Sequence, residues 1–312
     1  MPEIGEKIAT RKAFGEELLK LGGTHKNIVV LDADLSCSVM TNMFAKRYDG
    51  RHFNVGIAEA NMVGTAAGFA LRGKIAFVAS FAVFATGRCY DQIRASVCYP
   101  NLNVKVMGTH SGMMVGEDGA THQMLEDLNL MRGLPNMKVF CPADAYETCQ
   151  VLEAIVNDFG PAYVRLGRNG VPVIYDENYK FEIGKGDIVR NGKNVCVFAI
   201  GSTVSSALEA AEKLEANGKT CRVVNMCSIK PIDEDLIVAC AEECDELFSI
   251  EDHSIIGGLG SAVSEVLTSK HPKKLHRLGM KDVFGESGKS ADLYKKYKLD
   301  GDGVYEQIKE LL

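Results

Sequence analysis

A single carboxylate stands among small and apolar residues in the segment 54–68 (NVGIAEANMVGTAAG). Glu59 lies at the start of an expected helix that otherwise contains mostly Ala, Gly, Val and Met. In one interpretation the glutamate complements the positive end of the helix dipole, which is worth about 0.3–1 kcal/mol. In the other, a carboxylate in a nearly apolar interface exchanges a proton with the heterocycle of a bound ligand. The residue types alone leave both interpretations open, although the small residues would let a cofactor or another chain approach closely.

A glycine-rich loop carries two histidines and an aspartate. In 109–123 (THSGMMVGEDGATHQ), His110, Asp118 and His122 are spaced eight and four residues apart, after an expected strand at 104–108. Ligands of α/β sheets bind at the carboxyl ends of the strands. A lone histidine on a loop is more often simply solvated, but three polar groups on one loop, downstream of Glu59, favour a substrate site.

Two further pairs of residues are ambiguous on their own. Arg11 and Arg168 are surface charges by default, although guanidinium groups suit phosphate because they bind its oxygens bidentately and keep their charge. Phe81 and Phe84 are three residues apart, and two phenylalanines at this spacing usually belong to a core. These residues acquire a functional interpretation only in combination with the others.

The hydrophobic pattern indicates which elements position these side chains. Short runs rich in Val, Ile and Phe alternate with longer segments of helical period, which is typical of βαβ units and parallel sheets. Asp144, with Glu147 three residues later, resembles a capping box that begins a helix. In this first block the expected strands are 27–31, 75–80, 104–108, 138–141 and 162–166, and the expected helices lie near 10–21, 57–71, 86–98, 124–132 and 144–158.

A second α/β block follows a polar, glycine-dotted stretch. We predict an α/β protein of two doubly wound domains, each a mostly parallel sheet flanked by helices, at 1–170 and 195–312, with a linker at 171–194 that holds one β-ribbon. The turn Gly257–Gly260 resembles an anion-binding helix start, but it lacks the lysine of a P-loop, which favours a close-packed turn. The expected strands of this block are 195–200, 221–226 and 247–250, and its helices are 204–216, 233–244 and one that begins at 257–261.

Composition excludes several classes of protein. With 35 Lys and Arg against 41 Asp and Glu, the 312 residues carry a net charge of −6, which argues against nucleic acid as a partner. The most apolar stretch, 75–87, is shorter than the roughly 18–20 residues that cross a bilayer, so we expect no membrane association. The N-terminus shows no secretory signal, and we expect a cytoplasmic protein. Ten cysteines are too few for a disulfide-stapled fold of this length and are interpreted as structural thiols.

The motifs together resemble one enzyme family. The run GIAE at 56–59, followed by NMVG at 61–64, is similar to the glutamate motif of transketolases and other thiamin diphosphate enzymes. The run 116–123 (GEDGATHQ) resembles the GEDGxTHQ loop of transketolases, which narrows the family. The run 80–85 (SFAVFA) is similar to the aromatic strand end of that family. The resemblance covers nearly the whole chain, but only the pyrimidine-binding and C-terminal domains of a full-length transketolase.

On the cofactor side, the resemblance implies that Glu59 is catalytic and hydrogen-bonds the aminopyrimidine of thiamin diphosphate. The cofactor then supplies the nucleophile of the reaction. Phe81 and Phe84 would stack against that ring, and Asp34 would support the site indirectly. Gly87 stands where the family often has a tyrosine.

On the substrate side, the resemblance implies that His122 contacts the donor sugar near its carbonyl and that Asp118 reads a hydroxyl. His110 would reach the acceptor. The residue after His110 is Ser111, where the family commonly has an aspartate. The residues implied for binding the sugar phosphate are Arg11, Ser38 and Arg168.

The motif that holds the diphosphate and its metal in this family is missing at the expected place. The only GDG run, Gly301–Gly303, lies close to the end of the chain. The resemblance therefore implies the C-terminal subunit of a split transketolase, which acts on sugar phosphates with a separate N-terminal subunit in an α2β2 assembly. Thiamin diphosphate would be the cofactor, with Mg²⁺ or Ca²⁺ bound mainly by the partner.

Three alternatives remain. The β subunit of a 2-oxo acid dehydrogenase shares the layout and the glutamate, but it needs neither the two arginines nor the loop histidines. A half of a 1-deoxyxylulose-phosphate synthase handles sugar phosphates, but its loop normally diverges from the sequence at 117–122. A non-catalytic scaffold would have no reason to retain Glu59, Asp118 and both histidines.

Overall fold

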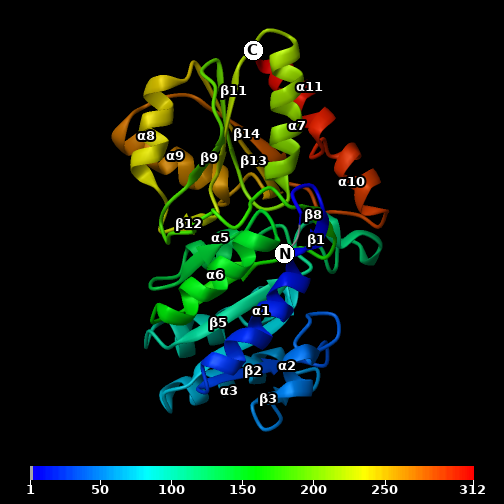
Figure 1. The fold of residues 1–312 in the computed structure, drawn as a ribbon, viewed down its shortest axis with the longest axis vertical. Helices are drawn as coiled ribbons and strands as arrows, with labels where there is room; N and C mark the ends of the chain where they lie inside the picture. Colours follow the sequence, from blue (N-terminus) through cyan, green and yellow to red (C-terminus); the bar gives the residue numbers. More distant parts are fainter. Residues whose placement is uncertain (1–2) are drawn as a thin grey trace.

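The computed structural model describes residues 3–312, which form two α/β lobes stacked end to end (Figure 1). Within these residues the N-terminal lobe is built on a seven-stranded sheet of order β12-β6-β7-β5-β4-β2-β3, and the C-terminal lobe on a five-stranded sheet of order β14-β13-β10-β11-β9. Neighbouring strands are parallel except for the pairs β12–β6 and β11–β9. The chain is therefore an α/β protein with two mostly parallel, helix-flanked sheets, as the sequence predicts.

The strands and helices of the N-terminal lobe follow each other in the expected alternation. Its strands are β1 (Lys7–Ala9), β2 (Ile28–Asp32), β3 (His52–Asn54), β4 (Ile75–Phe81), β5 (Val104–Thr109), β6 (Lys138–Phe140), β7 (Ala162–Arg165) and β8 (Gly170–Pro172). Its helices are α1 (Thr10–Thr24), α2 (Asn42–Arg47), α3 (Glu59–Leu71), α4 (Tyr90–Gln92), α5 (Asp127–Arg132) and α6 (Ala145–Asn157), with π-helical turns η1 (Val83–Arg88) and η2 (Ile93–Cys98) and the 3₁₀ turn η3 (Met113–Asp118).

The C-terminal half of the chain contains the second sheet and one strand that returns to the first. Its strands are β9 (Asp187–Arg190), β10 (Val195–Ala199), β11 (Cys221–Asn225), β12 (Ser228–Lys230), β13 (Glu246–Ser254) and β14 (Leu275–Met280). Its helices are α7 (Thr203–Ala216), α8 (Glu234–Glu243), α9 (Leu259–Lys270), α10 (Ser290–Lys296) and α11 (Gly301–Leu311). In Figure 1, α8 and α9 lie on one side of this sheet and α7 and α11 on the other.

The central strands are apolar throughout because both faces of each sheet are covered. All five residues of β2 are buried. Ile28 and Val30 pack in the core cluster that contains Phe14 of α1, whereas Val29 packs in the cluster that contains Met62 of α3. Successive side chains of a strand point to opposite faces, so a strand between two helical layers requires an uninterrupted apolar run.

The stretch 171–194 differs from its prediction, because the β-ribbon expected within it is wrong. β8 pairs with β1, and β9 becomes an edge strand of the second sheet by pairing with β11. Each strand finds its partner outside the stretch, which local alternation cannot reveal. β12 also crosses back to pair with β6 of the first sheet. The domain boundaries themselves, at 170 and 195, stay a prediction.

The helix expected near 86–98 is not one regular helix. It consists of η1, the short α4 and η2. The Cys89 thiol donates to the carbonyl of Phe84, five residues earlier, at 3.4 Å. Single π-helical turns are rare and concentrate at functional sites. The turn η1 begins at Val83, two residues after the end of β4.

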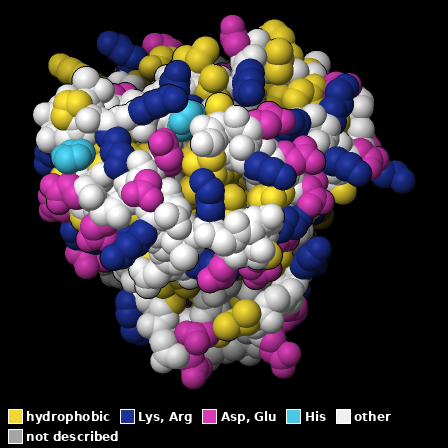
Figure 2. Space-filling model, turned by 90° about the horizontal axis from the view of Figure 1, so that it is seen from above, with side chains coloured by type: hydrophobic (Ala, Val, Ile, Leu, Met, Phe, Trp, Pro, Cys, Tyr) yellow, Lys and Arg dark blue, Asp and Glu magenta, His cyan; other side chains and the backbone are white. Residues whose placement is uncertain are grey.

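The surface and the thiols complete this description. Over the face seen in Figure 2, acidic and basic side chains are intermingled. Among residues 3–312 no helix combines the length and the apolar character needed to cross a bilayer. The cysteines are free, and all but Cys37 and Cys149 are buried, as expected of structural thiols. The cytoplasmic location stays a prediction.

Candidate functional site

Four parallel strands of the first sheet end at the same edge, and residues predicted from the sequence cluster there. Phe81 is the last residue of β4, His110 directly follows β5, Asp34 follows β2, and Arg168 follows β7. β3, the next strand along the chain, pairs with one edge of β2, and the following strand, β4, pairs with the other edge of β2. Such a reversal of strand order opens a crevice at the carboxyl ends of the strands, where α/β proteins bind ligands.

Four rings at this edge form what we call the aromatic cluster: Phe81, Phe84, His110 and His122. The Phe81 ring stacks on the His110 imidazole with centroids 3.8 Å apart and lies nearly parallel to the Phe84 ring at 5.8 Å. His122 presents its ring at a steep angle to Phe81 at 6.2 Å and to Phe84 at 5.4 Å. The tertiary structure thus joins the aromatic strand end to the histidine loop.

His110 is the most buried ionisable group of the cluster, with 3% of its surface exposed. Burial, reinforced by the positive charges of Arg11 and Arg168, lowers its pKa to about 3. A hydrogen bond of 2.9 Å joins its Nδ1 to the Thr109 hydroxyl. The imidazole is therefore neutral at physiological pH and is able to donate from one nitrogen and accept at the other.

The two predicted arginines lie together beside the aromatic cluster. Arg11 donates from Nε to the carbonyl of Arg168 at 3.0 Å and from Nη1 to the carbonyl of Ser38 at 2.6 Å. Arg168 donates to the carbonyl of Val115, and its Nη1 lies 3.6 Å from a carboxylate oxygen of Asp118. Burial and the nearby charge of Arg168 lower the pKa of Arg11. Two guanidinium groups held this close would both gain from an anion bound between them.

Glu59 connects to the aromatic cluster through a residue that the sequence analysis missed. It is the first residue of α3 and is 5% exposed. Its Oε1 accepts a hydrogen bond from Nη1 of Arg88 at 3.0 Å. The same guanidinium lies 4.2 Å from the centroid of the Phe84 ring. Two signals point to Arg88: carboxylates are rarely buried without a cation, and Arg88 follows Phe84 by four residues, about one helical turn.

Asp34 contributes through the backbone rather than through its side chain. Its main-chain N–H donates to Oδ1 of Asn54 at 3.1 Å, and the same oxygen accepts from the N–H of Gly56 at 2.9 Å. Asp34 has a φ of 61° and is exposed. The side chain of Asn54 therefore ties the turn after β2 to the segment that leads into Glu59. This agrees with an indirect contribution, which stays a prediction.

The histidine loop is held by the C-terminal lobe, which no local signal in the sequence reveals. The N–H of Met113 donates to Oδ1 of Asp252 in β13 at 2.9 Å. The Ser290 hydroxyl donates to the carbonyl of Met114 at 3.0 Å, and the Gln123 amide donates to the carbonyl of residue 286 at 2.9 Å. Hydrogen bonds from the C-terminal lobe thus hold the loop that carries Asp118 and His122.

The two departures from the family pattern change the shape of the site. The Ser111 hydroxyl donates to the carbonyl of Leu166 at 3.0 Å, so this side chain is committed to the backbone. A Cβ placed on Gly87 would have Met124 as its nearest neighbour, at 4.0 Å. A Cβ at this position would therefore fit without a clash.

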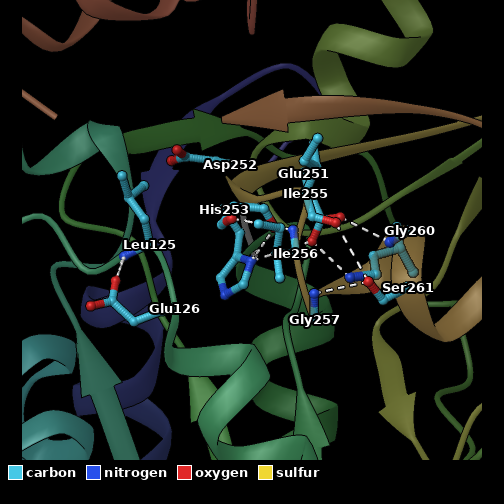
Figure 3. A network of polar contacts seen from close by, with 12 residues as sticks. Leu125, Glu126, Glu251, Asp252, His253, Ile255, Ile256, Gly257, Gly260 and Ser261 are labelled. Carbon is cyan, nitrogen blue, oxygen red and sulfur yellow. Dashed lines mark hydrogen bonds and ion pairs between the residues drawn. The ribbon is translucent and has the colours of Figure 1, made fainter. Parts of the chain in front are cut away.

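The turn Gly257–Gly260 is closed by a side chain of this chain, as the close-packed interpretation predicts. The Glu251 carboxylate accepts hydrogen bonds from the N–H groups of Leu259 at 2.7 Å and Gly260 at 2.8 Å (Figure 3). His253, fully buried beside it, has its pKa lowered to about 4 by burial. The N–H groups at the N-terminus of α9 are thus already hydrogen-bonded within the chain.

The GDG run at Gly301–Gly303 also has a local explanation. It begins α11, where the Asp300 side chain accepts from the N–H of Gly303 at 2.9 Å. Asp302 pairs with Lys213 of α7. These contacts make the run a helix start packed against a neighbouring helix, in agreement with its exclusion as a diphosphate motif.

Comparison with known families matches both halves of the chain. Residues 6–173 match the family model of the transketolase pyrimidine binding domain. Residues 184–304 match that of the transketolase C-terminal domain. The chain belongs to the transketolase family.

Several relatives of similar length are known. A Methanocaldococcus jannaschii protein, provisionally named a transketolase C-terminal section, is 50% identical over 96% of this chain and 95% of its own length. A 6-deoxy-6-sulfo-D-fructose transketolase subunit from Clostridium sp. is 38% identical over 96% of this chain and 94% of its own. Rat transketolase is 37% identical over 99% of this chain, which spans 50% of the rat protein.

A solved structure shows the same transketolase architecture. A split-gene transketolase, described as an inactive β4 tetramer, superimposes with a TM-score of 0.90 and 48% identity over 98% of both chains. Transketolase from Campylobacter jejuni gives a TM-score of 0.85 at 26% identity, and this chain covers 48% of it. The likeness extends through both lobes.

Proposed function

We propose that this chain is the C-terminal subunit of a split transketolase. With a separate N-terminal subunit it transfers a two-carbon ketol unit from a ketose phosphate to an aldose phosphate, with thiamin diphosphate as cofactor. The observation that carries this proposal is the grouping of these residues at the carboxyl edge of the first sheet. Arg88 links the Glu59 carboxylate to the aromatic cluster. The Arg11–Arg168 pair lies near enough to His110 for its positive charge to lower the pKa of that imidazole.

The residues present fit an aminopyrimidine ring. Glu59 and the half-buried Phe84 ring are both contacted by one long side chain, Arg88, which is 55% exposed. A heteroaromatic ring with a basic nitrogen would find a carboxylate for its edge and an aromatic face for stacking. When bound, thiamin diphosphate supplies the carbon nucleophile of the transfer. Phe81 packs nearly parallel to Phe84, and His110 stacks on Phe81.

Each remaining group has a distinct part in substrate handling. His110, which is neutral, and His122 are positioned to hold sugar oxygens and to move protons at them. Asp118, on the rim of the site and paired with Arg168, is positioned to accept a hydrogen bond from a sugar hydroxyl. Arg11 and Arg168 would bind the terminal phosphate, because their guanidinium groups keep their charge and match its oxygens.

The relatives support a divided enzyme. Proteins named as subunits of transketolases for a sulfo-sugar and for apulose 4-phosphate match 95% or more of this chain over about its own length. This chain spans only 50% of the length of rat transketolase. A separate chain would then supply the diphosphate and Mg²⁺ or Ca²⁺ site, and we propose an α2β2 assembly with active sites between chains.

The direct test is reconstitution. The purified chain, a diphosphate-binding transketolase chain, thiamin diphosphate and Mg²⁺ are mixed with a ketose phosphate and an aldose phosphate, and the product sugars are quantified. Wild type should be active, and Glu59→Ala should lower the rate about 100- to 10,000-fold, because it removes the proton-exchanging group. Glu16→Ala, which alters an exposed glutamate on α1 paired with Lys12, is the matched control.

Three outcomes contradict the proposal. Full activity of Glu59→Ala would remove Glu59 from the chemistry. Full activity of the chain alone would remove the need for a partner. Turnover of 2-oxo acids in place of sugar phosphates would assign the chain to a different thiamin diphosphate reaction.

A further inference from the structure

We infer that Arg88 is a latch on the cofactor-ring site: in the free chain it occupies both contacts that the ring needs, and it swings out when the ring binds. The inference rests on the proposed function and goes beyond it. It concerns a residue outside the motifs that indicate the family.

The geometry shows that one guanidinium fills two positions at once. Its Nη1 donates to Oε1 of Glu59 at 3.0 Å, and its Cζ lies 4.2 Å from the centroid of the Phe84 ring. A ring stacked on this face of Phe84 and bonded to Oε1 of Glu59 requires the same space and the same carboxylate oxygen. Arg88 and the ring therefore exclude each other.

Burial determines which of the partners can move. Glu59 is 5% exposed and is fixed at the first turn of α3, whereas the Arg88 side chain is 55% exposed. An arginine keeps its head in water at little cost by rotating about its flexible stem. The carboxylate and the phenylalanine thus stay in place while Arg88 leaves.

The exchange of partner would also change what Glu59 does. A carboxylate bonded to a guanidinium is ionised and only accepts hydrogen bonds. A neutral ring nitrogen is an acceptor and needs a donor from the carboxyl group. Release of Arg88 frees Oε1 of Glu59 for the ring, and the proton of the hydrogen bond between the carboxyl group and the ring nitrogen comes from solvent.

The local backbone is suited to such a movement. Arg88 ends the π-helical turn η1, and the hydroxyl of Thr86 donates to the carbonyl of Ala82 at 2.7 Å within the same turn. π-helical turns occur mostly as isolated insertions at functional sites. Arg88, the last residue of this turn, is 55% exposed, whereas Ala85 and Thr86 of the same turn are buried.

The test measures cofactor affinity rather than turnover. Thiamin diphosphate, with Mg²⁺ in excess, is titrated calorimetrically into the complex of this chain with its diphosphate-binding partner. Arg88→Met removes the charge but keeps much of the side-chain length. The dissociation constant should fall about 3- to 10-fold, because the ion pair and the cation–π contact made by the exposed Arg88 no longer compete with the ring.

Controls separate the latch from a general charge effect. Arg72→Met removes an arginine just after the opposite end of α3, about 20 Å from Glu59 along the helix, and should leave the affinity unchanged. Arg88→Lys keeps the charge and should bind close to wild type. Arg88→Gln is the second variant should the methionine prove insoluble, and it should also bind more tightly.

Each outcome bears on one of the two proposals. Unchanged or weaker binding by Arg88→Met and Arg88→Gln, with normal binding by wild type, overturns the latch and leaves the proposed function standing. Absence of thiamin diphosphate binding by wild type and by every variant overturns the proposed function, and the latch with it. Tighter binding by Arg72→Met as well overturns the latch in favour of a general charge effect.

Discussion

Burial at the aromatic cluster decides which site residues carry a charge. His110 is kept neutral because the protein interior and two nearby guanidinium groups disfavour a third positive charge, and its pKa falls to about 3. Arg11 and Arg168 remain cationic beside it. The site therefore combines two positively charged guanidinium groups, which suit a phosphate, with a neutral imidazole, which suits sugar oxygens.

The low pKa of His110 predicts a pH dependence of stability. In the unfolded chain the imidazole binds a proton near pH 6.5, whereas in the folded chain it does so only near pH 3. The stabilisation is fully present above pH 6.5 and is lost as the pH falls, because the unfolded state takes up the proton first. Between pH 7 and pH 5, wild type should lose on the order of 1–2 kcal/mol more unfolding free energy than His110→Gln.

Urea unfolding at the two pH values measures this difference. His271→Gln, at a partly exposed ring on the surface, is the matched control and should keep the wild-type pH dependence. An equal loss in wild type and in His110→Gln would show that His110 is protonated in the folded chain.

Among the elements, the histidine loop depends most on tertiary contacts. Gly112 has a φ of 69°, and a Cβ placed there would lie 2.2 Å from Oδ2 of Asp252. Its neighbour Met113 donates its N–H to the same carboxylate. Only glycine lets the backbone pass this close to β13 in that conformation.

Gly112→Ala should therefore destabilise the chain by about 2–4 kcal/mol, because the free-energy cost of a positive φ at alanine adds to the cost of the clash with Asp252. Gly64→Ala is the matched control. It lies in α3 with nothing within 4 Å of its Cβ position, so it should stabilise the isolated chain by about 0.5–1 kcal/mol. Urea unfolding measures both, and a neutral Gly112→Ala would contradict the clamped loop.

Across the whole molecule, buried polar groups join the two lobes. Arg165 of β7 donates to the carboxylate of Asp127 at 2.8 Å and to the carbonyl of Asp252 in β13 at 2.8 Å. Asn225 of β11 donates to Glu147 of α6 at 2.9 Å. The pairing of β12 with β6 adds a main-chain connection. We therefore expect the lobes to unfold as one cooperative unit in spite of their separate sheets.

Calorimetry should accordingly show a single unfolding transition. Arg165→Met should lower the free energy of unfolding by about 3–5 kcal/mol, because it leaves the fully buried Asp127 without its cation. The transition should stay single and move to lower temperature. Arg190→Met, which breaks a more exposed pair with Glu215, should have a small effect. Two separate transitions in wild type would contradict the cooperative unit.

Much of the fold could be predicted because its signals are local. The runs at β2, β4, β5, β10 and β11 lie within about two residues of their predicted bounds, since a strand buried on both faces must be apolar throughout. The short elements α2, β3 and β12 escaped prediction, and so did β14, α10 and α11 beyond the last predicted helix. Elements of three to six residues carry too little periodicity, and their existence depends on partners distant in the sequence.

For the site, the sequence by itself determined which residues are present to do chemistry. Glu59, His110, Asp118, His122 and the arginines stand in recognisable runs because side-chain type and short spacing are written along the chain. Only the tertiary structure decided what each residue contacts. The Arg88–Glu59 pair spans 29 residues and the Met113–Asp252 bond spans 139, and such contacts exist only after both sheets have packed.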